Sequence, residues 1–187
     1  MVRKAKSDGV RITTEVSPHH FTLTDDAVST YGANAKMNPP LRSERDRNAL
    51  IEGLVDGTID AIATDHAPHA EYEKQWGMNR APFGVVGLET ALALTLRLVQ
   101  QGRLTLERAI TALTSAPAAV LGLQKGTLEP GAAADVTLID LEASWTVDPG
   151  RFRSKSRNTP FSGWTLKGQV IRTLVAGKTV YQGPEAE

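Results

Sequence analysis

The sequence predicts an α/β protein that ends in a small β unit, and three observations support this fold class. Apolar, β-branched runs at residues 10–16 and 59–64 are typical of strands, and the second run is apolar on both faces, as in buried parallel strands. Helical patterns alternate with these runs, which favours a parallel sheet or an α/β barrel. From Gly126 onward, Gly/Pro turns separate short β-rich runs. We therefore divide the chain into residues 1–125 and 126–187.

A complete (β/α)8 barrel requires about 250 residues, and this chain has 187. The first part is therefore either a small sheet or a piece of a barrel. Ser43 is expected to cap a helix that stops at Gly57, and a strong helix of about 14 residues is expected within residues 88–102. In the second part, residues 176–178 are expected to form a hairpin turn. Further helix N-caps are expected at Thr24, Thr105 and Ser115.

The composition argues against several classes of function. Lys+Arg and Asp+Glu are both 21, so a formal net charge of zero provides no electrostatic case for binding nucleic acid or an acidic membrane surface. No apolar run approaches the roughly 20 residues of a membrane span, and the first residues lack the apolar core of a secretory signal. A chain without cysteine has no disulfide framework and no thiolate metal site, which suits the cytoplasm, where we expect this protein to act.

Titratable side chains gather where the apolar run at residues 59–64 ends. Asp65 follows this run directly, at the C-terminal end of a predicted buried strand. If the sheet is a barrel, this end lies on the catalytic face. A carboxylate there can bind a metal ion and accept a proton from bound water, or it can simply cap the next turn. His66 is expected to point away from Asp65 and to make a structural hydrogen bond. His69, after Pro68, either turns back over the site to donate to an anionic substrate or lies exposed in a loop.

His19 and His20 follow the predicted strand at residues 10–16. On an extended backbone, adjacent histidine side chains diverge, so they are poor joint ligands for one zinc ion. The spacings typical of zinc sites are His-x-His on a strand and His-x3-His on a helix, and neither occurs. With four histidines and no cysteine, this chain alone makes an unconvincing zinc site.

Two loop segments carry groups that suit recognition of a small polar ligand. Pro39 holds Asn38 in non-helical backbone, and the Asn38 amide both donates and accepts hydrogen bonds, which suits a ring amide or a carboxylate. Gly84 and Gly87 come just before a helix, where free backbone N–H groups can bind an anion or a carbonyl. An ordinary turn and an ordinary loop-to-helix junction are the alternatives.

Five segments stand in a characteristic order and spacing: EVSPHHFTLTDD, KMNPPLR, DGTIDAIATDHAPH, APFGVVGLET and GTLEPGAAADVTLID. Together they closely resemble bacterial dihydroorotase, an enzyme of pyrimidine synthesis in the amidohydrolase superfamily. The resemblance covers essentially the whole chain. TDHAPH combined with KMNPPLR is quite specific, whereas the last segment is shared by many amidohydrolases.

The resemblance implies a zinc-dependent cyclic amidase that interconverts N-carbamoyl-L-aspartate and dihydroorotate at a binuclear metal centre. It implies that Asp65 is both a zinc ligand and the general acid/base. It also implies that the substrate is contacted by Asn38, His69, Phe83 and Gly84.

The fold implied by the resemblance is a partial (β/α)8 amidohydrolase barrel. Residues 1–125 would be about the last three β/α units, and residues 126–187 a small β-sandwich segment. The family's His-x-His, its other metal-binding histidines and its metal-bridging acid or carbamylated lysine are absent; the family places them before the helix tail at residues 2–9. We therefore expect an incomplete chain that is inactive alone. We also expect it to associate with itself or with an N-terminal half.

Two other functions stay open. A non-catalytic, dihydroorotase-like module that scaffolds aspartate transcarbamoylase would also lack metal ligands, although the retained Asn38, Asp65 and His69 argue against it. A hydantoinase or allantoinase would use related chemistry, but SPHH and KMNPPLR fit dihydroorotase better.

Overall fold

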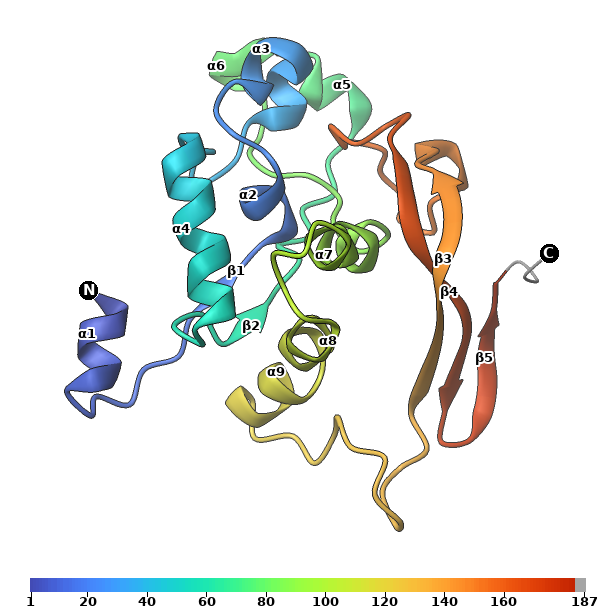
Figure 1. Cartoon of the computed structure of the whole chain (residues 1–187). Helices are drawn as coiled ribbons and strands as arrows, with labels where there is room; N and C mark the ends of the chain where they lie inside the picture. Colours follow the sequence, from blue (N-terminus) through green and yellow to red (C-terminus); the bar gives the residue numbers. More distant parts are fainter. Residues whose placement is uncertain (184–187) are drawn as a thin grey trace.

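The computed structural model describes residues 1–183 and contains two sheets (Figure 1). The first is a parallel pair of short strands, β1 (Glu15–Val16) and β2 (Ala61–Ile62), with Val16 opposite Ile62. An isolated parallel bridge joins His66 to Val85 just beyond β2. The second sheet is antiparallel, in the order β3-β4-β5, and its strands are β3 (Val136–Thr146), β4 (Thr165–Val175) and β5 (Lys178–Gln182).

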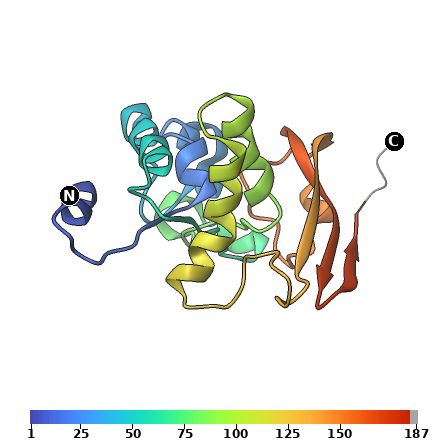
Figure 2. The same ribbon diagram turned by 60° about the horizontal axis from the view of Figure 1, so that its bottom comes forward.

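Helices surround the parallel pair, and α7 separates it from the antiparallel sheet in both ribbon views (Figures 1 and 2). Helix α1 stands apart from the body, at the end of the molecule opposite β5. None of the helices in residues 1–183 has the length and apolar character required to traverse a bilayer. The helices are α1 (Val2–Ser7), α2 (Pro18–Thr22), α3 (Ala27–Tyr31), η1 (Gly32–Ala35), α4 (Glu44–Val55), α5 (Glu71–Lys74), α6 (Gly77–Arg80), α7 (Ala91–Gln100), α8 (Leu106–Leu113), α9 (Ser115–Val120) and η2 (Pro149–Arg151).

The parallel pair and its helices agree with an α/β class, but the structure does not confirm three barrel units. Within residues 1–183, two parallel strands pair and one bridge follows. The predicted strand at residues 10–16 is paired as a strand only at Glu15–Val16, and Val10 and Ile12 are exposed. The β-sandwich segment is one three-stranded sheet in the described part of the chain.

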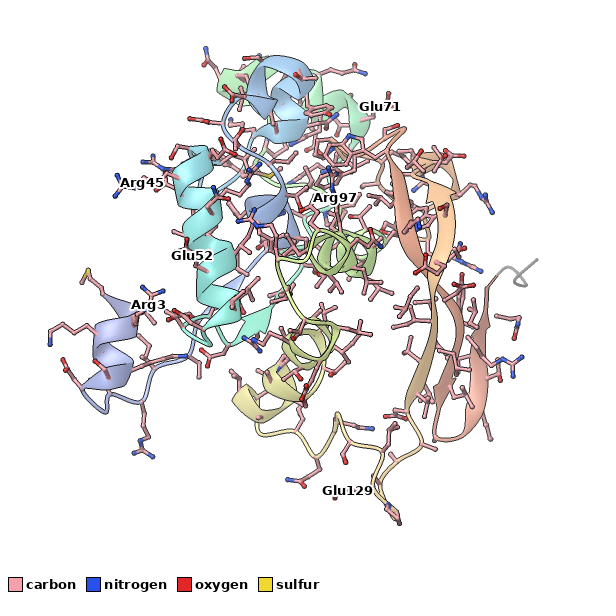
Figure 3. All side chains as sticks on the ribbon, in the orientation of Figure 1. Arg3, Arg45, Glu52, Glu71, Arg97 and Glu129 are labelled. Carbon is pink, nitrogen blue, oxygen red and sulfur yellow. The ribbon has the colours of Figure 1, made fainter. Side chains whose placement is uncertain are left out.

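The division at residue 126 stays a prediction, since the structure shows one hydrophobic core to which both parts contribute. Val147, Phe161 and Leu166 belong to the same buried cluster as Phe21 and Leu94. Figure 3 shows Arg97 of α7 in the crowded centre of the molecule, where its guanidinium lies 5.0 Å from the Trp164 ring centroid. The two sequence regions are therefore packed against each other along α7.

Local signals predicted some element boundaries and missed others. Ser43 caps α4 by accepting a hydrogen bond from the Asp46 N–H at 3.3 Å, and Thr105 caps α8 by accepting one from the Arg108 N–H at 3.1 Å. The predicted hairpin is confirmed, with positive φ at Ala176 and Gly177, as tight hairpin turns require. The N-caps predicted at Thr24 and Ser115 are wrong: α3 begins at Ala27, and Ser115 lies inside α9.

The backbone assumed for the adjacent histidines is also wrong. His19 and His20 lie on the short helix α2, which starts with Pro18 in the first turn. Their rings pack together with centroids 4.3 Å apart, where an extended backbone would send them to opposite sides.

Close packing of β4 on α7 generates a stability prediction. Gly168 has a φ of +95°, and a Cβ at this position would overlap Cδ1 of Leu96. We expect Gly168→Ala to lower the free energy of unfolding by about 2 to 4 kcal/mol, because overpacking adds to the cost of a left-handed backbone. Gly163→Ala is the control, since Gly163 has a φ of +79° but open space around its Cβ position; it should lose only about 1 to 2 kcal/mol. Equal losses in urea denaturation would contradict this packing.

Candidate functional site

Asp65 lies three residues beyond β2, with its carboxylate half exposed. Its side chain is 51% accessible, and its φ is +48°, in the left-handed region that non-glycine residues seldom occupy. Aspartate tolerates this region better than most residues, but such strain persists only where the surrounding structure holds it. Within residues 1–183, no hydrogen bond engages the Asp65 carboxylate, so the turn-capping alternative has no support in the structure.

The nearest ionisable partner of Asp65 is His19, which sequence reasoning had set aside. His19 is 2% exposed, and its Nε2 lies 4.0 Å from Oδ2 of Asp65. That Nε2 is buried and has no hydrogen-bond partner among the described residues. Burial, and then the neighbouring charge of His20, lower the pKa of His19 to about 3. His19 is therefore neutral at physiological pH, and its contact with Asp65 is not an ion pair.

Asn38 is connected to this pair through the other histidine of α2. Nε2 of His20 lies 2.8 Å from the carbonyl oxygen of Pro39, directly after Asn38. Asn38 itself is exposed. Within residues 1–183, Asp65 forms no hydrogen bond with either Asn38 or His69, so the structure does not join these predicted site residues directly.

His69 and Phe83 do come together. Nε2 of His69 lies 2.9 Å from the carbonyl oxygen of Phe83, and because a carbonyl only accepts, Nε2 carries the proton. Phe83 is 52% exposed, and Nζ of Lys36 lies 4.4 Å from the centroid of its ring. His66 fulfils its predicted structural role by accepting a hydrogen bond at Nδ1 from the N–H of Gly87, at 3.1 Å.

Position 84 requires glycine for two reasons, its backbone conformation and the lack of space for a side chain. Its φ is +92°, and a Cβ there would lie 2.6 Å from Cβ of Ala67. The prediction of free backbone N–H groups at Gly84 and Gly87 is wrong. The Gly84 N–H donates to the carbonyl of Lys36 at 2.8 Å, and the Gly87 N–H donates to His66.

Two lysines bind the carbonyl groups that surround Phe83. Nζ of Lys36 donates to the Ala81 carbonyl at 2.6 Å, and Nζ of Lys74 donates to the carbonyls of Pro82 and Gly84, each at 2.9 Å. Lys74 is only 8% exposed. Burial, and then the nearby charge of Lys36, lower the pKa of Lys74 to about 8.

Three residues of this region were missed as contributors: His19, Lys74 and Asn158. The extended backbone predicted for His19 and His20 is helix α2 in the structure, and for this reason the sequence does not indicate His19. Lys74 lies in an ordinary polar run, and Asn158 in a basic, loop-like segment, so composition indicates exposure for both. Both are buried. Only the tertiary contacts of distant segments identify them.

The residues present do not complete a zinc centre. Zinc sites in proteins have at least three protein ligands. No cluster of three or more His, Cys, Asp or Glu side chains with metal-binding geometry exists within residues 1–183. Asp65 has an unengaged carboxylate and His19 an unpartnered ring nitrogen, so the described chain offers at most this incomplete set. We derive no reaction step through a metal from it.

The buried Lys74 ammonium predicts a specific dependence of stability on pH. Its pKa is about 8 in the folded state, against an ordinary value of 10.5 for an unfolded chain. Between these pH values the unfolded state binds more protons, so stability rises with pH as the cost of the buried charge disappears. We expect the free energy of unfolding of the wild type, minus that of Lys74→Met, to rise by about 3 kcal/mol from pH 8 to 10.5. Chemical denaturation measures this difference.

The same difference between pH 6 and 7 is the internal control. Lys74 is protonated there in both states, so the difference should be constant. If the difference in free energy of unfolding between the wild type and Lys74→Met stays constant from pH 6 to 10.5, Lys74 is not a buried ammonium.

Comparisons with known proteins confirm the resemblance to dihydroorotase. Residues 2–180 match the model of the amidohydrolase family. The chain is 58% identical over 183 residues to a dihydroorotase of Pelotomaculum thermopropionicum, and 57% identical over 182 residues to one of Syntrophotalea carbinolica. Each alignment covers 97% of this chain and 43% of the relative, so the chain spans less than half the length of these relatives.

A solved structure has a similar fold. L-Hydantoinase (dihydropyrimidinase) from Arthrobacter aurescens superposes with a TM-score of 0.93 and 34% sequence identity, over 100% of this chain and 43% of that one. The antiparallel sheet and the parallel pair thus occur together in a larger enzyme. With the family model matching nearly all of the sequence, the chain belongs to the amidohydrolase family.

Proposed function

We propose that this chain is the part of a dihydroorotase that carries the catalytic aspartate and much of the substrate pocket. The reaction is the reversible, zinc-dependent hydrolysis of dihydroorotate to N-carbamoyl-L-aspartate in pyrimidine biosynthesis. The observation that carries the proposal is Asp65, a half-exposed carboxylate on strained backbone beyond a buried parallel strand. Identities of 53% to 58% to relatives named dihydroorotase support this substrate over others.

Asp65 would act as the general acid/base and as a ligand of the metal centre. When bound, zinc would polarise the ring carbonyl and make the water more acidic. In the hydrolytic direction, Asp65 accepts a proton as the oxygen of water bonds to the ring carbonyl carbon. It then returns that proton to the ring nitrogen as the carbon–nitrogen bond breaks. The exposed, unengaged carboxylate suits such a transfer, since no hydrogen bond must first be broken.

The substrate would lie against Asn38, His69 and the Phe83–Gly84 pair. Asn38 offers a donor and an acceptor to a ring amide or a carboxylate. Because Nε2 of His69 donates to Phe83, its other nitrogen, Nδ1, would face the substrate, and donation to an anionic group there requires the protonated ring. Phe83 contributes an exposed ring beside the charge of Lys36, which suits a flat, anionic ligand.

The remaining metal ligands would come from another polypeptide segment. The matched region is 43% of the relatives' length, and the described residues hold an incomplete donor set. We propose that an N-terminal half supplies these ligands and packs against the segment that leads into β1, where Val10 and Ile12 are exposed. A second copy of the chain and aspartate transcarbamoylase are the other proposed partners.

A hydantoinase activity is the second candidate, and a specific observation favours it. The L-hydantoinase fold superposes on the entire chain. Its identity of 34% is well below that of the relatives named dihydroorotase, which is why we place it second. A non-catalytic scaffold is favoured less, because Asp65 stays exposed and unengaged.

The role of Asp65 is tested by complementation. The chain is mixed or co-expressed with the N-terminal part of the Pelotomaculum thermopropionicum dihydroorotase that precedes the matched region, and hydrolysis of dihydroorotate and bound zinc are measured. We expect no activity from the chain alone and activity from the pair. Asp65→Asn should lower kcat at least about 100-fold, because general acid/base catalysis contributes about this much or more.

Asp25→Asn is the matched control, since Asp25 is an exposed aspartate with no predicted role. It should retain the activity and zinc content of the complemented wild type. An Asp65→Asn variant as active as Asp25→Asn would refute the catalytic role. A full-length fusion without zinc or activity would favour the scaffold.

Substrate choice separates the first two candidates. The complemented enzyme is assayed with dihydroorotate, hydantoin and allantoin at equal concentrations. We expect kcat/KM for dihydroorotate to exceed the others by at least about 100-fold, because sites built around a charged or hydrogen-bonding group strongly reject ligands that lack it. A preference for hydantoin would replace our proposal with the second candidate.

A further inference from the structure

The connection between β3 and β4, residues 147–164, reaches out of the antiparallel sheet to the loops of the candidate site. Its backbone contacts them at two places. The carbonyl of Asn158 accepts a hydrogen bond from the N–H of Val86 at 3.0 Å, and the N–H of Ser154 donates to Oε1 of Glu89 at 2.7 Å. The connection is thus anchored directly after the Phe83–Gly84 pair.

The Asn158 side chain makes three hydrogen bonds at this junction. Nδ2 donates to the carbonyl of Ala67 at 2.9 Å and to the carbonyl of Gly84 at 3.3 Å. Oδ1 accepts from the backbone N–H of His69 at 3.1 Å. Asn158 is 6% exposed, so these bonds are shielded from water. One buried amide therefore joins the loop that carries His69 to the segment that carries Gly84.

An amide is the side-chain type that can make this set of contacts. It has two N–H donors and an acceptor oxygen in one plane, and the junction offers two carbonyls and one N–H. A carboxylate would place negative charge against two carbonyls, and an apolar side chain would leave all three backbone groups without this partner. The contacts are completed by His69 itself, whose imidazole bonds the Phe83 carbonyl.

We propose that Asn158 is a positioning residue, which sets the distance and orientation between His69 and the Phe83–Gly84 pair. It acts through the backbone groups of Ala67, His69 and Gly84 and forms no hydrogen bond with Asp65. Its loss should therefore disturb substrate binding more than the chemical step. The binding part of this inference rests on the proposed function, whereas the positioning part concerns the folded chain alone.

The positioning part is tested by hydrogen exchange in the 187-residue chain. In Asn158→Leu, we expect the His69 amide to exchange at least about fivefold faster, the factor that one typical hydrogen bond represents. The Val86 amide bonds the backbone carbonyl of residue 158, so its exchange should stay within about twofold and report that the connection remains in place. Asn158→Asp retains the acceptor and should protect the His69 amide better than Asn158→Leu does.

Thr159→Val is the matched control in the same connection. Thr159 is also buried, and its hydroxyl accepts a hydrogen bond only from the nearby Phe161 N–H among the described residues. Neither the His69 nor the Val86 amide should change its exchange rate beyond about twofold. If Asn158→Leu leaves the His69 amide unchanged, or accelerates both amides equally, the positioning role is wrong.

The binding part is tested in the complemented enzyme. For Asn158→Leu we expect KM for dihydroorotate to rise at least about tenfold while kcat stays within about threefold, since misplaced binding groups raise KM when the reacting groups are intact. Thr159→Val should alter neither constant beyond about twofold. An unchanged KM, or an equal loss in kcat, would overturn the inference. Absence of hydrolysis in the wild type would refute the proposed function instead, and hydrogen exchange would still decide the positioning role.

Discussion

The backbone carbonyl groups of Ala81, Pro82 and Gly84, which are buried or partly buried, impose the constraint on which the candidate site depends. Buried backbone acceptors require donors, and this segment is too irregular to receive them from a sheet. Lys36, Lys74 and Asn158 supply them from three separate parts of the chain. The left-handed backbone of Gly84 and its close approach to Ala67 are compatible with this arrangement only without a side chain. Because the donors are charged or amide groups, the segment is held firmly without a regular strand.

The same constraint explains why the second sheet belongs to the site. The donor Asn158 comes from the connection between β3 and β4, and that connection is held by the shared core around α7. Val147 and Phe161 of the connection and Leu166 of β4 are all buried in this core. A change in the packing of β4 would therefore reach the loop of His69 through a short, physically continuous path. The division into a barrel part and a β part describes the chain order better than it describes the packing.

Sequence reasoning succeeded where the signal is local. The cap at Ser43, the cap at Thr105 and the positive-φ hairpin depend on residues within a few positions of each other. It failed at α2 because the SPHH segment is short, and the alternation of the preceding strand was extended into it. It could not find Lys74 or Asn158, whose burial is created by carbonyls that are 8 to 91 residues away in sequence. The roles of Asp65, Asn38, His69, Phe83 and Gly84 stay predictions, although the structure places Phe83, Gly84 and His69 in direct contact or close succession.

Asp65 does not behave like a structural aspartate. An aspartate that stabilises a turn accepts backbone hydrogen bonds, as Asp56 and Asp148 do here with Thr58 and Gly150. Asp65 lacks such bonds among the described residues and has a strained, left-handed backbone. This conformation lowers the stability of the fold, and no hydrogen bond of the Asp65 side chain offsets the loss. Its neighbour His19 is neutral, and therefore cannot compensate the carboxylate with a charge. An uncompensated carboxylate beside an unpartnered imidazole nitrogen is an arrangement that a cation or a reacting substrate would stabilise.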